Sequence, residues 1–199
     1  MSAFSVTPPS EGRRRILSLW LPRLPTDRIK RRSHCNDARV ETSPCIVVAK
    51  DHNALVISAL NDAATRLGLE PGLPLANARA ICPDIAVFDA DDAADAKTLN
   101  DIADWCDRFT PLVALDAPQG LLLDISGCAH LFGSEAAMLK TICDALRRQG
   151  FVVSAAIAGT AACARTLTRA KPGCIVAEGQ EAAAVAALPV FTLGADDAI

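Results

Sequence analysis

Residues 112–125 read LVALDAPQGLLLDI, and this stretch carries the clearest structural signal in the chain. Two apolar runs, 112–116 and 121–125, flank a short turn that contains a proline and a glycine. Such a pattern is typical of a β-hairpin. The stretch therefore predicts two paired strands in the second half of the chain.

The segments after the hairpin alternate between helix and strand signals. Ser134 can cap a helix that continues to about Gln149 and ends at Gly150. Further along we expect a strand at 151–157, a helix at 160–170, a short strand at 174–177 and a helix at 180–187. The C-terminal half is thus predicted to run hairpin, helix, strand, helix, strand.

The segments before the hairpin supply one more strand of the same sheet and a separate group of elements. Residues 16–21 form an apolar run that ends at Pro22, which indicates a strand. Adding this strand to the C-terminal half gives an α+β fold with a split βαβ, ferredoxin-like sheet. A basic, polar connection follows, and then strands at 45–49, 55–57 and 85–88 and helices at 61–67, 74–81 and 93–109.

The charge of the chain is unevenly distributed. The 199 residues are 51% hydrophobic and 22% charged, with a net charge of −3, so the chain can bury a substantial core. Residues 1–32 hold eight basic and two acidic residues, whereas residues 84–107 hold eight aspartates and one lysine. A basic segment beside an acidic helix is compatible with nucleic acid on one face only, and a merely solvated basic segment is an equal alternative.

Neither a membrane nor a metal is indicated by the sequence. No apolar run is long enough to span a bilayer and no secretory signal is recognisable, so we expect a cytoplasmic protein that binds no membrane. The eight cysteines form no CxxC pair and no zinc-finger spacing with histidine. Reduced, buried thiols are therefore expected, with no metal and no cofactor.

Several strings in the chain resemble the Y-family, UmuC-like translesion DNA polymerases. Residues 59–69 (ALNDAATRLGL), followed by 71–75 and 78–83, resemble the motif of the family's fingers. The hairpin resembles the strand pair that bears the family's Asp-Glu, and residues 169–173 (RAKPG) resemble its Lys-Pro-Asn-Gly motif. The resemblance runs from about Arg15 to Pro189 and implies a ferredoxin-like palm with a small inserted fingers subdomain.

The resemblance also implies a division of the chain. We expect a disordered lead-in at 1–12, the first palm strand at 13–24, a fingers-like insertion at 25–88, the rest of the palm at 89–187 and the start of a truncated thumb at 188–199.

The carboxylates that bind metal in the family are missing at the matching positions. Phosphoryl transfer to a 3′-hydroxyl uses two divalent cations held by converging carboxylates. The resemblance places the first-strand positions at Trp20 and Pro22 and the Asp-Glu pair at Gln119 and Gly120. We therefore assign no catalytic, cofactor-binding or metal-binding residue.

The residues expected to hold a nucleotide triphosphate are changed as well. The family's fingers Tyr and Arg match Asp62 and Thr65, and its ribose-excluding residue matches near Leu24 and Pro25. Asp62 would repel a triphosphate, and Thr65 lacks the bidentate fork of an arginine. Lys171 is the one member of the phosphate-gripping set that is retained.

This combination resembles the ImuB-type branch, the non-catalytic Y-family homologues of bacterial mutagenesis cassettes. The strings that carry the resemblance are 19–28 (LWLPRLPTDR) and 120–133 (GLLLDISGCAHLFG). It implies a scaffold in damage-induced translesion synthesis that binds DNA and links a sliding clamp, a RecA-like accessory protein and a separate error-prone polymerase. The family's partner-binding peptides lie beyond the part that this chain covers.

The basic residues are the candidate DNA contacts. The full set is Arg13, Arg14, Arg15, Arg23, Arg28, Arg165, Arg169 and Lys171. A solvated helix face is an equal alternative for the last three. Two other functions stay open: a weakly active polymerase or nucleotidyltransferase, which would need Asp116 and Asp124 to converge on a metal, and an interaction module without DNA binding.

Overall fold

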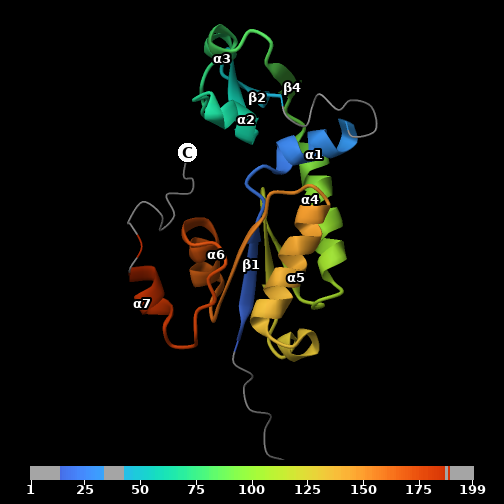
Figure 1. Cartoon of the computed structure of the whole chain (residues 1–199), viewed down its shortest axis with the longest axis vertical. Coiled ribbons are helices and arrows are strands. Elements are labelled where there is room, and N and C mark those ends of the chain that lie inside the picture. Colours follow the sequence, from blue (N-terminus) through green and yellow to red (C-terminus); the bar gives the residue numbers. More distant parts are fainter. Residues whose placement is uncertain (1–13, 34–42, 187, 189–199) are drawn as a thin grey trace, which may run out of the picture.

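The computed structural model describes residues 14–33, 43–186 and 188. Two β-sheets organise these residues, a four-stranded sheet below and a three-stranded sheet above it (Figure 1). The predicted lead-in at 1–12, Arg13 and, except for Leu188, the predicted thumb segment lie outside the described residues.

The four-stranded sheet has the ferredoxin-like arrangement that the sequence predicts. Its strand order is β5-β6-β1-β7, and every neighbouring pair is antiparallel. Along the chain, helix α4 (Asp92–Cys106) lies between β1 and the hairpin, and helix α5 (Glu135–Arg148) lies between the hairpin and the last strand. The strands are β1 (Ile16–Trp20), β5 (Val113–Asp116), β6 (Gly120–Asp124) and β7 (Ser154–Ala158).

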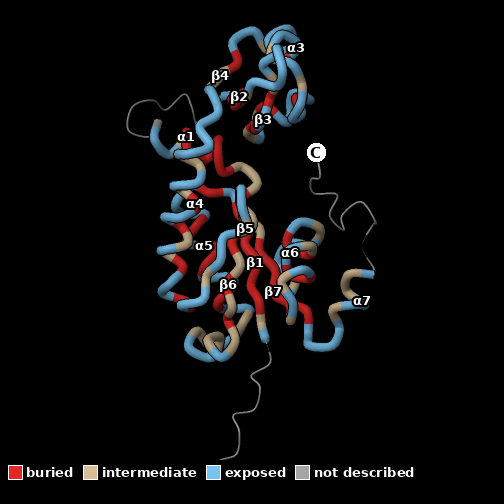
Figure 2. The backbone as a smooth tube through the Cα atoms, turned by 180° about the vertical axis from the view of Figure 1, so that it is seen from behind, coloured by how far each residue is buried: buried red, intermediate tan, exposed pale blue. Residues whose placement is uncertain are grey.

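Helices cover both faces of this sheet, because successive residues of its strands point to opposite faces and apolar residues are buried on each face. Leu17 and Leu19 of β1 are buried on the face that packs against α4 and α5. Ile16 is buried on the other face, against helix α6 (Ala161–Ala170). Figure 2 shows the resulting band of buried residues along β1 and β7, between the two helical layers.

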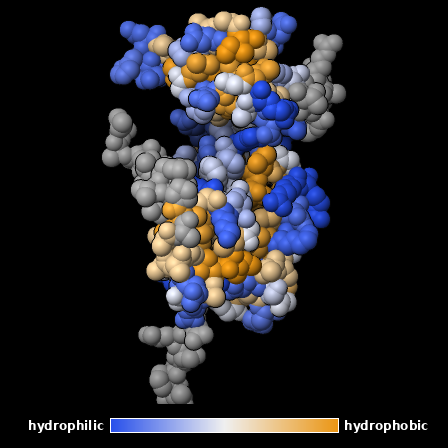
Figure 3. Space-filling view, turned by 60° about the vertical axis from the view of Figure 1, so that its left-hand side comes forward, coloured by the Kyte–Doolittle hydropathy of each residue, from blue (hydrophilic) through white to orange (hydrophobic). Residues whose placement is uncertain are grey.

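The three-stranded sheet forms a second unit, which we call the β2–β4 unit (residues 45–89). Its strand order is β3-β2-β4, with β2 at Cys45–Asp51, β3 at Ala54–Leu60 and β4 at Ala86–Asp89. Helices α2 (Asp62–Arg66) and α3 (Leu75–Ile81) complete the unit. Figure 3 shows apolar surface gathered on this upper unit, where Leu55, Leu67 and Ile81 are among the exposed large apolar residues.

A helix, α1 (Leu24–Ser33), occupies part of the segment in which we expected a polar connection. Pro22 and Pro25 suggested an interrupted chain, but a proline in the first turn of a helix is tolerated because its missing N–H would have no helical partner there. Asp27 in the first turn and basic residues in the last turn also suit the helix dipole. Ile29 packs α1 against the β2–β4 unit, so this helix joins the two parts.

The C-terminal elements differ in length from the prediction. Strand β7 begins at Ser154 rather than at residue 151. The strand expected at 174–177 is reduced to one isolated bridge between Ile157 and Ile175. Gly173 and Gly179 both adopt positive φ, which turns the backbone at each position. The few residues between these turns form only a single β-bridge. Helix α7 spans Glu181–Ala186.

The described cysteines are free thiols, and four of them are buried: Cys45, Cys106, Cys143 and Cys163. Burial raises the pKa of Cys106 to about 12 and that of Cys45 to about 11, which keeps these thiols protonated and unreactive. In the part of the chain that the structure describes, no helix has both the length and the apolar character to cross a bilayer.

Candidate functional site

A row of four residues crosses the upper end of the four-stranded sheet, where β1 ends next to α1. The strand register places Asp116 beside Gly120, Gly120 beside Trp20, and Trp20 beside Ser154. The backbone N–H of Leu21 donates to the carbonyl of Gln119 at 2.8 Å, which fixes the turn of the hairpin against β1. The predicted positions Trp20, Gln119 and Gly120 therefore do converge.

An ion pair lies over this row. Arg165 of α6 extends across the sheet to Asp116 on the edge strand β5. Its Nε is 2.8 Å from Asp116 Oδ2 and its Nη2 is 2.7 Å from Oδ1. This is the bidentate geometry that makes arginine–carboxylate pairs strong and directional. Both oxygens of the carboxylate are thus held by one guanidinium.

Gly120 fits the row because it has no side chain. A Cβ at this position would lie 2.8 Å from the carbonyl oxygen of Asp116 and 3.1 Å from its Oδ2. The first of these atoms belongs to the backbone, so a larger residue would require the hairpin to shift. The space that a side chain at position 120 would need is therefore taken up by Asp116.

The remaining side chains at this end are aromatic or basic. The guanidinium carbon of Arg169 lies 5.6 Å from the centroid of the Trp20 ring, within the range of a cation–π contact. Lys171 is exposed and follows the end of α6 directly. Three of the predicted DNA contacts thus lie near the upper end: Arg165, whose charge is paired with Asp116, Arg169 and Lys171.

The residues of the row do not fit a pair of magnesium ions. Magnesium prefers carboxylate and other oxygen ligands. Trp20 and Gly120 offer no side-chain oxygen, and Ser154 and the neighbouring Gln119 each offer one neutral oxygen. Both oxygens of Asp116 bind Arg165. Across residues 14–33, 43–186 and 188, no three His, Cys, Asp or Glu side chains are grouped so that they could hold a metal ion.

Asp124 does not supply the missing ligand. Asp116 is registered with Gly120, and Asp124 lies four residues further along β6, which is about 13 Å at the usual rise per residue. At its own end of the strand, Asp124 is 3.5 Å from Nε of Arg14. The two aspartates therefore do not converge, which removes the arrangement that a weakly active polymerase would need.

A cleft of about 460 Å³ separates the hairpin turn from the β2–β4 unit. Gln119, Leu24 and Pro25 line it together with Ser58 and Ala59. Aspartates contribute to the lining, but no described lysine or arginine does. The cleft therefore lacks the cations that a triphosphate requires.

Asp62 and Thr65, the two positions matched to triphosphate contacts, are used elsewhere. The Thr65 hydroxyl donates to the carbonyl of Asn61 at 3.0 Å. Asp62 pairs with Arg23, and the hydrogen bond from that guanidinium lowers the pKa of the Asp62 carboxyl. This pair connects the segment before α1 to α2.

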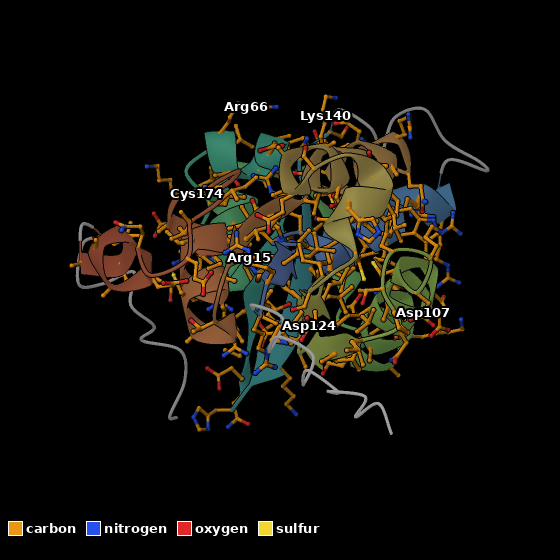
Figure 4. The ribbon with its side chains drawn as sticks, turned by 90° about the horizontal axis from the view of Figure 1, so that it is seen from below. Arg15, Arg66, Asp107, Asp124, Lys140 and Cys174 are labelled. Atoms are coloured by element: carbon orange, nitrogen blue, oxygen red, sulfur yellow. The ribbon has the colours of Figure 1, made fainter. Side chains whose placement is uncertain are left out.

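Two other predicted DNA contacts, Arg14 and Arg15, directly precede β1 at the lower end of the sheet. Arg15 is labelled in Figure 4, which views the molecule from below. Arg15 donates two hydrogen bonds of 2.6 Å to Glu135 and one of 2.8 Å to the carbonyl of Val176. The hydrogen bond to Glu135 raises the pKa of Arg15. Arg14 is exposed and lies beside Asp124. Arg14 and Arg15 thus lie at the end of β1 opposite the row.

Arg28 is buried and forms an ion pair with Asp95 of α4, which ties α1 to the four-stranded unit. This guanidinium is part of the packing. Whether any of the predicted basic residues contacts DNA stays a prediction, and Arg13 lies outside the described residues.

Comparison with known proteins places the chain in a family. Residues 32–169, more than half of the chain, match the impB/mucB/samB family. The chain belongs to this family. Protein ImuB of Caulobacter vibrioides strain NA1000 is 47% identical over 133 residues, which are 66% of this chain and 29% of ImuB. DNA polymerase IV 2 of Mesorhizobium japonicum is 31% identical over 124 residues, 61% of this chain and 30% of that protein.

Solved structures share the fold of this impB/mucB/samB chain. A post-insertion binary complex of Dbh DNA polymerase has a TM-score of 0.68 at 15% identity, covering 84% of this chain and 49% of that one. DinB from Sulfolobus solfataricus has a TM-score of 0.67 at 14% identity, covering 83% and 49%. The predicted fold class, the palm and fingers of a Y-family polymerase, is thereby confirmed. The chain spans less than a third of its curated relatives, ImuB and DNA polymerase IV 2.

The sequence did not reveal the pairing of Asp116 with Arg165. Both residues drew attention separately, the first as a possible metal ligand and the second as a phosphate contact. The signal that links them is the hairpin register, since Asp116 opposite Gly120 must share a sheet face with Trp20. Only the position of α6 on that face then brings Arg165 within reach.

Proposed function

We propose that the chain is the palm-and-fingers part of a non-catalytic Y-family scaffold that acts in damage-induced translesion DNA synthesis. One observation carries the proposal: the row at the upper end of the sheet has Trp20 and Gly120 at expected metal-ligand positions, and Arg165 binds both oxygens of the nearby Asp116. Membership of the impB/mucB/samB family and the similarity to ImuB support the connection with DNA synthesis past damage.

The organisation of the whole protein belongs to the same proposal. The palm comprises 13–24 and 89–187, the fingers comprise 25–88, and a thumb begins at 188. In the full-length protein, segments beyond this chain would contact a sliding clamp, a RecA-like accessory protein and an error-prone polymerase that performs the chemistry. The chain itself would contribute binding of primer–template or single-stranded DNA in the cytoplasm.

DNA is proposed to contact the upper end of the sheet. Arg169 and Lys171 lie there on one side of the row, and exposed cations are what phosphate contacts require. Arg165 is compensated by Asp116, and Arg15 and Arg28 are engaged in partly or fully buried pairs. These pairs favour Lys171 over Arg15, Arg28 and Arg165 as a phosphate contact.

A primer-extension assay tests the absence of catalysis. We expect no nucleotide incorporation by the purified chain on a primed template with either Mg²⁺ or Mn²⁺. Gln119→Ala should change neither this result nor DNA binding. Template-dependent extension by the chain, abolished by Asp116→Ala or by Gln119→Ala, would instead support a weakly active polymerase.

A salt-titrated anisotropy assay distinguishes the DNA-binding scaffold from an interaction module that does not bind DNA. We expect micromolar binding to primed and single-stranded DNA that weakens as salt rises, because phosphate contacts release counterions. Two substitutions that each remove one positive charge are compared: Lys171→Gln should weaken binding, and the control Lys140→Gln on α5 should not. No binding at low salt would contradict the DNA-binding part of the proposal.

A further inference from the structure

A groove of about 510 Å³ lies between the end of α1 and the neighbouring parts of α4 and α5. Figure 1 shows α1 above these two helices, on the side of the sheet opposite α6. The groove is therefore separate from the row at the upper end, which faces α6. Its size is within the usual range of ligand-binding clefts.

The wall of the groove formed by α1 is basic. Arg31 and Arg32 occupy the last turn of α1, and both are exposed. The guanidinium carbon of Arg31 lies 4.3 Å from the centroid of the Phe151 ring, and its Nη1 is 3.4 Å from Oε1 of Gln149. Arg31 is thus positioned by neutral groups, so its charge is not offset by these contacts.

The other lining residues add apolar surface and two compensated cations, and Asp101 also lines the groove. Arg28 is paired with Asp95. Lys97 of α4 is paired with Asp101 on the same helix at 2.9 Å. Ile102, Trp105 and Leu146 belong to or pack against the main hydrophobic core, and they form the apolar part of the lining. Among the residues that the structure describes, no carboxylate pairs with Arg31 or Arg32, so the groove combines positive charge with an apolar floor in a chain whose net charge is −3.

The surroundings of the groove disfavour nucleic acid as its ligand. A phosphate backbone extending along α4 would meet the exposed aspartates Asp101 and Asp104. The faces of the two aromatic rings are also engaged, that of Phe151 by Arg31 and that of Trp105 by Arg108. A base would thus find Phe151 buried and Trp105 already covered on one face by a cation. Charge complementarity instead fits a short ligand with a few carboxylates.

We propose that this groove binds a short acidic segment of a partner protein, in which an apolar side chain lies beside the carboxylates. The carboxylates would pair with Arg31 and Arg32, and the apolar side chain would contact the partly exposed Trp105. Since the groove and the row are on opposite sides of the sheet, partner and DNA would bind at the same time.

Fluorescence anisotropy with labelled peptides tests the proposal on the 199-residue chain. The probe is a fluorescein-labelled peptide in which Asp and Glu flank Leu and Phe, and a matched peptide carries Asn and Gln instead. We expect the acidic peptide to bind and the Asn/Gln peptide not to bind. The double variant Arg31→Glu/Arg32→Glu should weaken it by about tenfold or more, since it replaces two attractive contacts by repulsive ones.

A matched control separates the groove from the general charge of the chain. Arg79→Glu changes an exposed arginine of α3 in the β2–β4 unit and should leave the affinity within about twofold. Because Arg31 packs on Phe151, the exposed Arg32→Glu is also measured alone, and circular dichroism verifies the fold of each variant. Equal weakening by Arg79→Glu, equal binding of the Asn/Gln peptide, or displacement of the acidic peptide by single-stranded DNA would overturn the proposal.

Discussion

The two ends of the four-stranded sheet are each closed by an arginine–carboxylate pair, and the two pairs differ in burial. At the lower end, the side chains of Arg15 and Glu135 are 14% and 26% exposed. At the upper end, the side chains of Arg165 and Asp116 are 44% and 17% exposed. An exposed pair contributes little to stability and can exchange partners with solvent ions, whereas a buried pair is costly to break. The lower end is therefore structural, and the upper end is available for a ligand.

The largest effect should come from breaking the pair at the lower end. Arg15→Ala leaves Glu135 partly buried without its guanidinium and removes the hydrogen bond to the carbonyl of Val176. We expect the free energy of unfolding to fall by about 3 kcal/mol, measured by urea denaturation. The exposed Arg79→Ala should change it by less than about 0.5 kcal/mol. A loss as small as the control's would mean that the two ends do not differ.

Restoring a carboxylate at the upper end should also destabilise the protein. In Gly120→Glu, the new Cβ would be 2.8 Å from the Asp116 carbonyl oxygen, so the hairpin must move. We expect a loss of about 2 kcal/mol in thermal or urea unfolding. The neighbouring Gln119→Glu, which adds the same charge, should cost much less. A Gly120→Glu variant with the stability of the wild type would show that the row has room for a metal ligand.

The upper end also contains a pH-sensitive group in α1. Burial raises the pKa of Asp27 from 3.8 to about 6, and its Oδ2 accepts the backbone N–H of Val152 at 2.7 Å. Because the folded state favours the protonated carboxyl, the contribution of Asp27 to stability is complete below about pH 4 and is lost as the pH rises through 6.

Asp27→Asn removes this dependence. Relative to the wild type, the variant should gain on the order of 2 kcal/mol in unfolding free energy between pH 4 and pH 7. Urea denaturation across this range measures the difference. Asp104→Asn, an exposed aspartate of α4, is the control and should follow the wild type. A constant difference between wild type and Asp27→Asn would contradict the assignment.

The smallest effect concerns DNA. Asp116→Asn removes the carboxylate that compensates Arg165, whereas Asp124→Asn makes the same charge change at the lower end, next to Arg14. If DNA lies at the upper end, Asp116→Asn should tighten binding by about threefold at low salt and steepen the salt dependence by up to about one charge. Asp124→Asn should have a smaller effect. Equal effects would place the DNA elsewhere.

The hairpin and the core sheet could be predicted because their signals are local. Two apolar runs in 112–125, separated by a turn with a proline and a glycine, indicate the hairpin, and the structure pairs β5 with β6 there. Helix α1 was missed because Pro22 and Pro25 are usually chain breakers, although a proline is acceptable in a first turn.

The use of the arginines could not be predicted from the sequence. Arg15 pairs with a residue 120 positions away, and Arg165 with one 49 positions away, so neither partner follows from local spacing. The groove beside α1 likewise depends on how three helices meet. A basic composition therefore indicates contact with phosphate only after the structural pairs have been identified.

The most direct test of the central claim, that the upper end of the sheet holds no catalytic metal, is Mn²⁺ binding measured by electron paramagnetic resonance. The titration is performed with primed template and a nucleotide, with and without the chain. We predict that the chain leaves the free Mn²⁺ signal unchanged. Stoichiometric loss of the free signal on addition of the chain, reversed by Asp116→Ala or Gln119→Ala, would contradict the account.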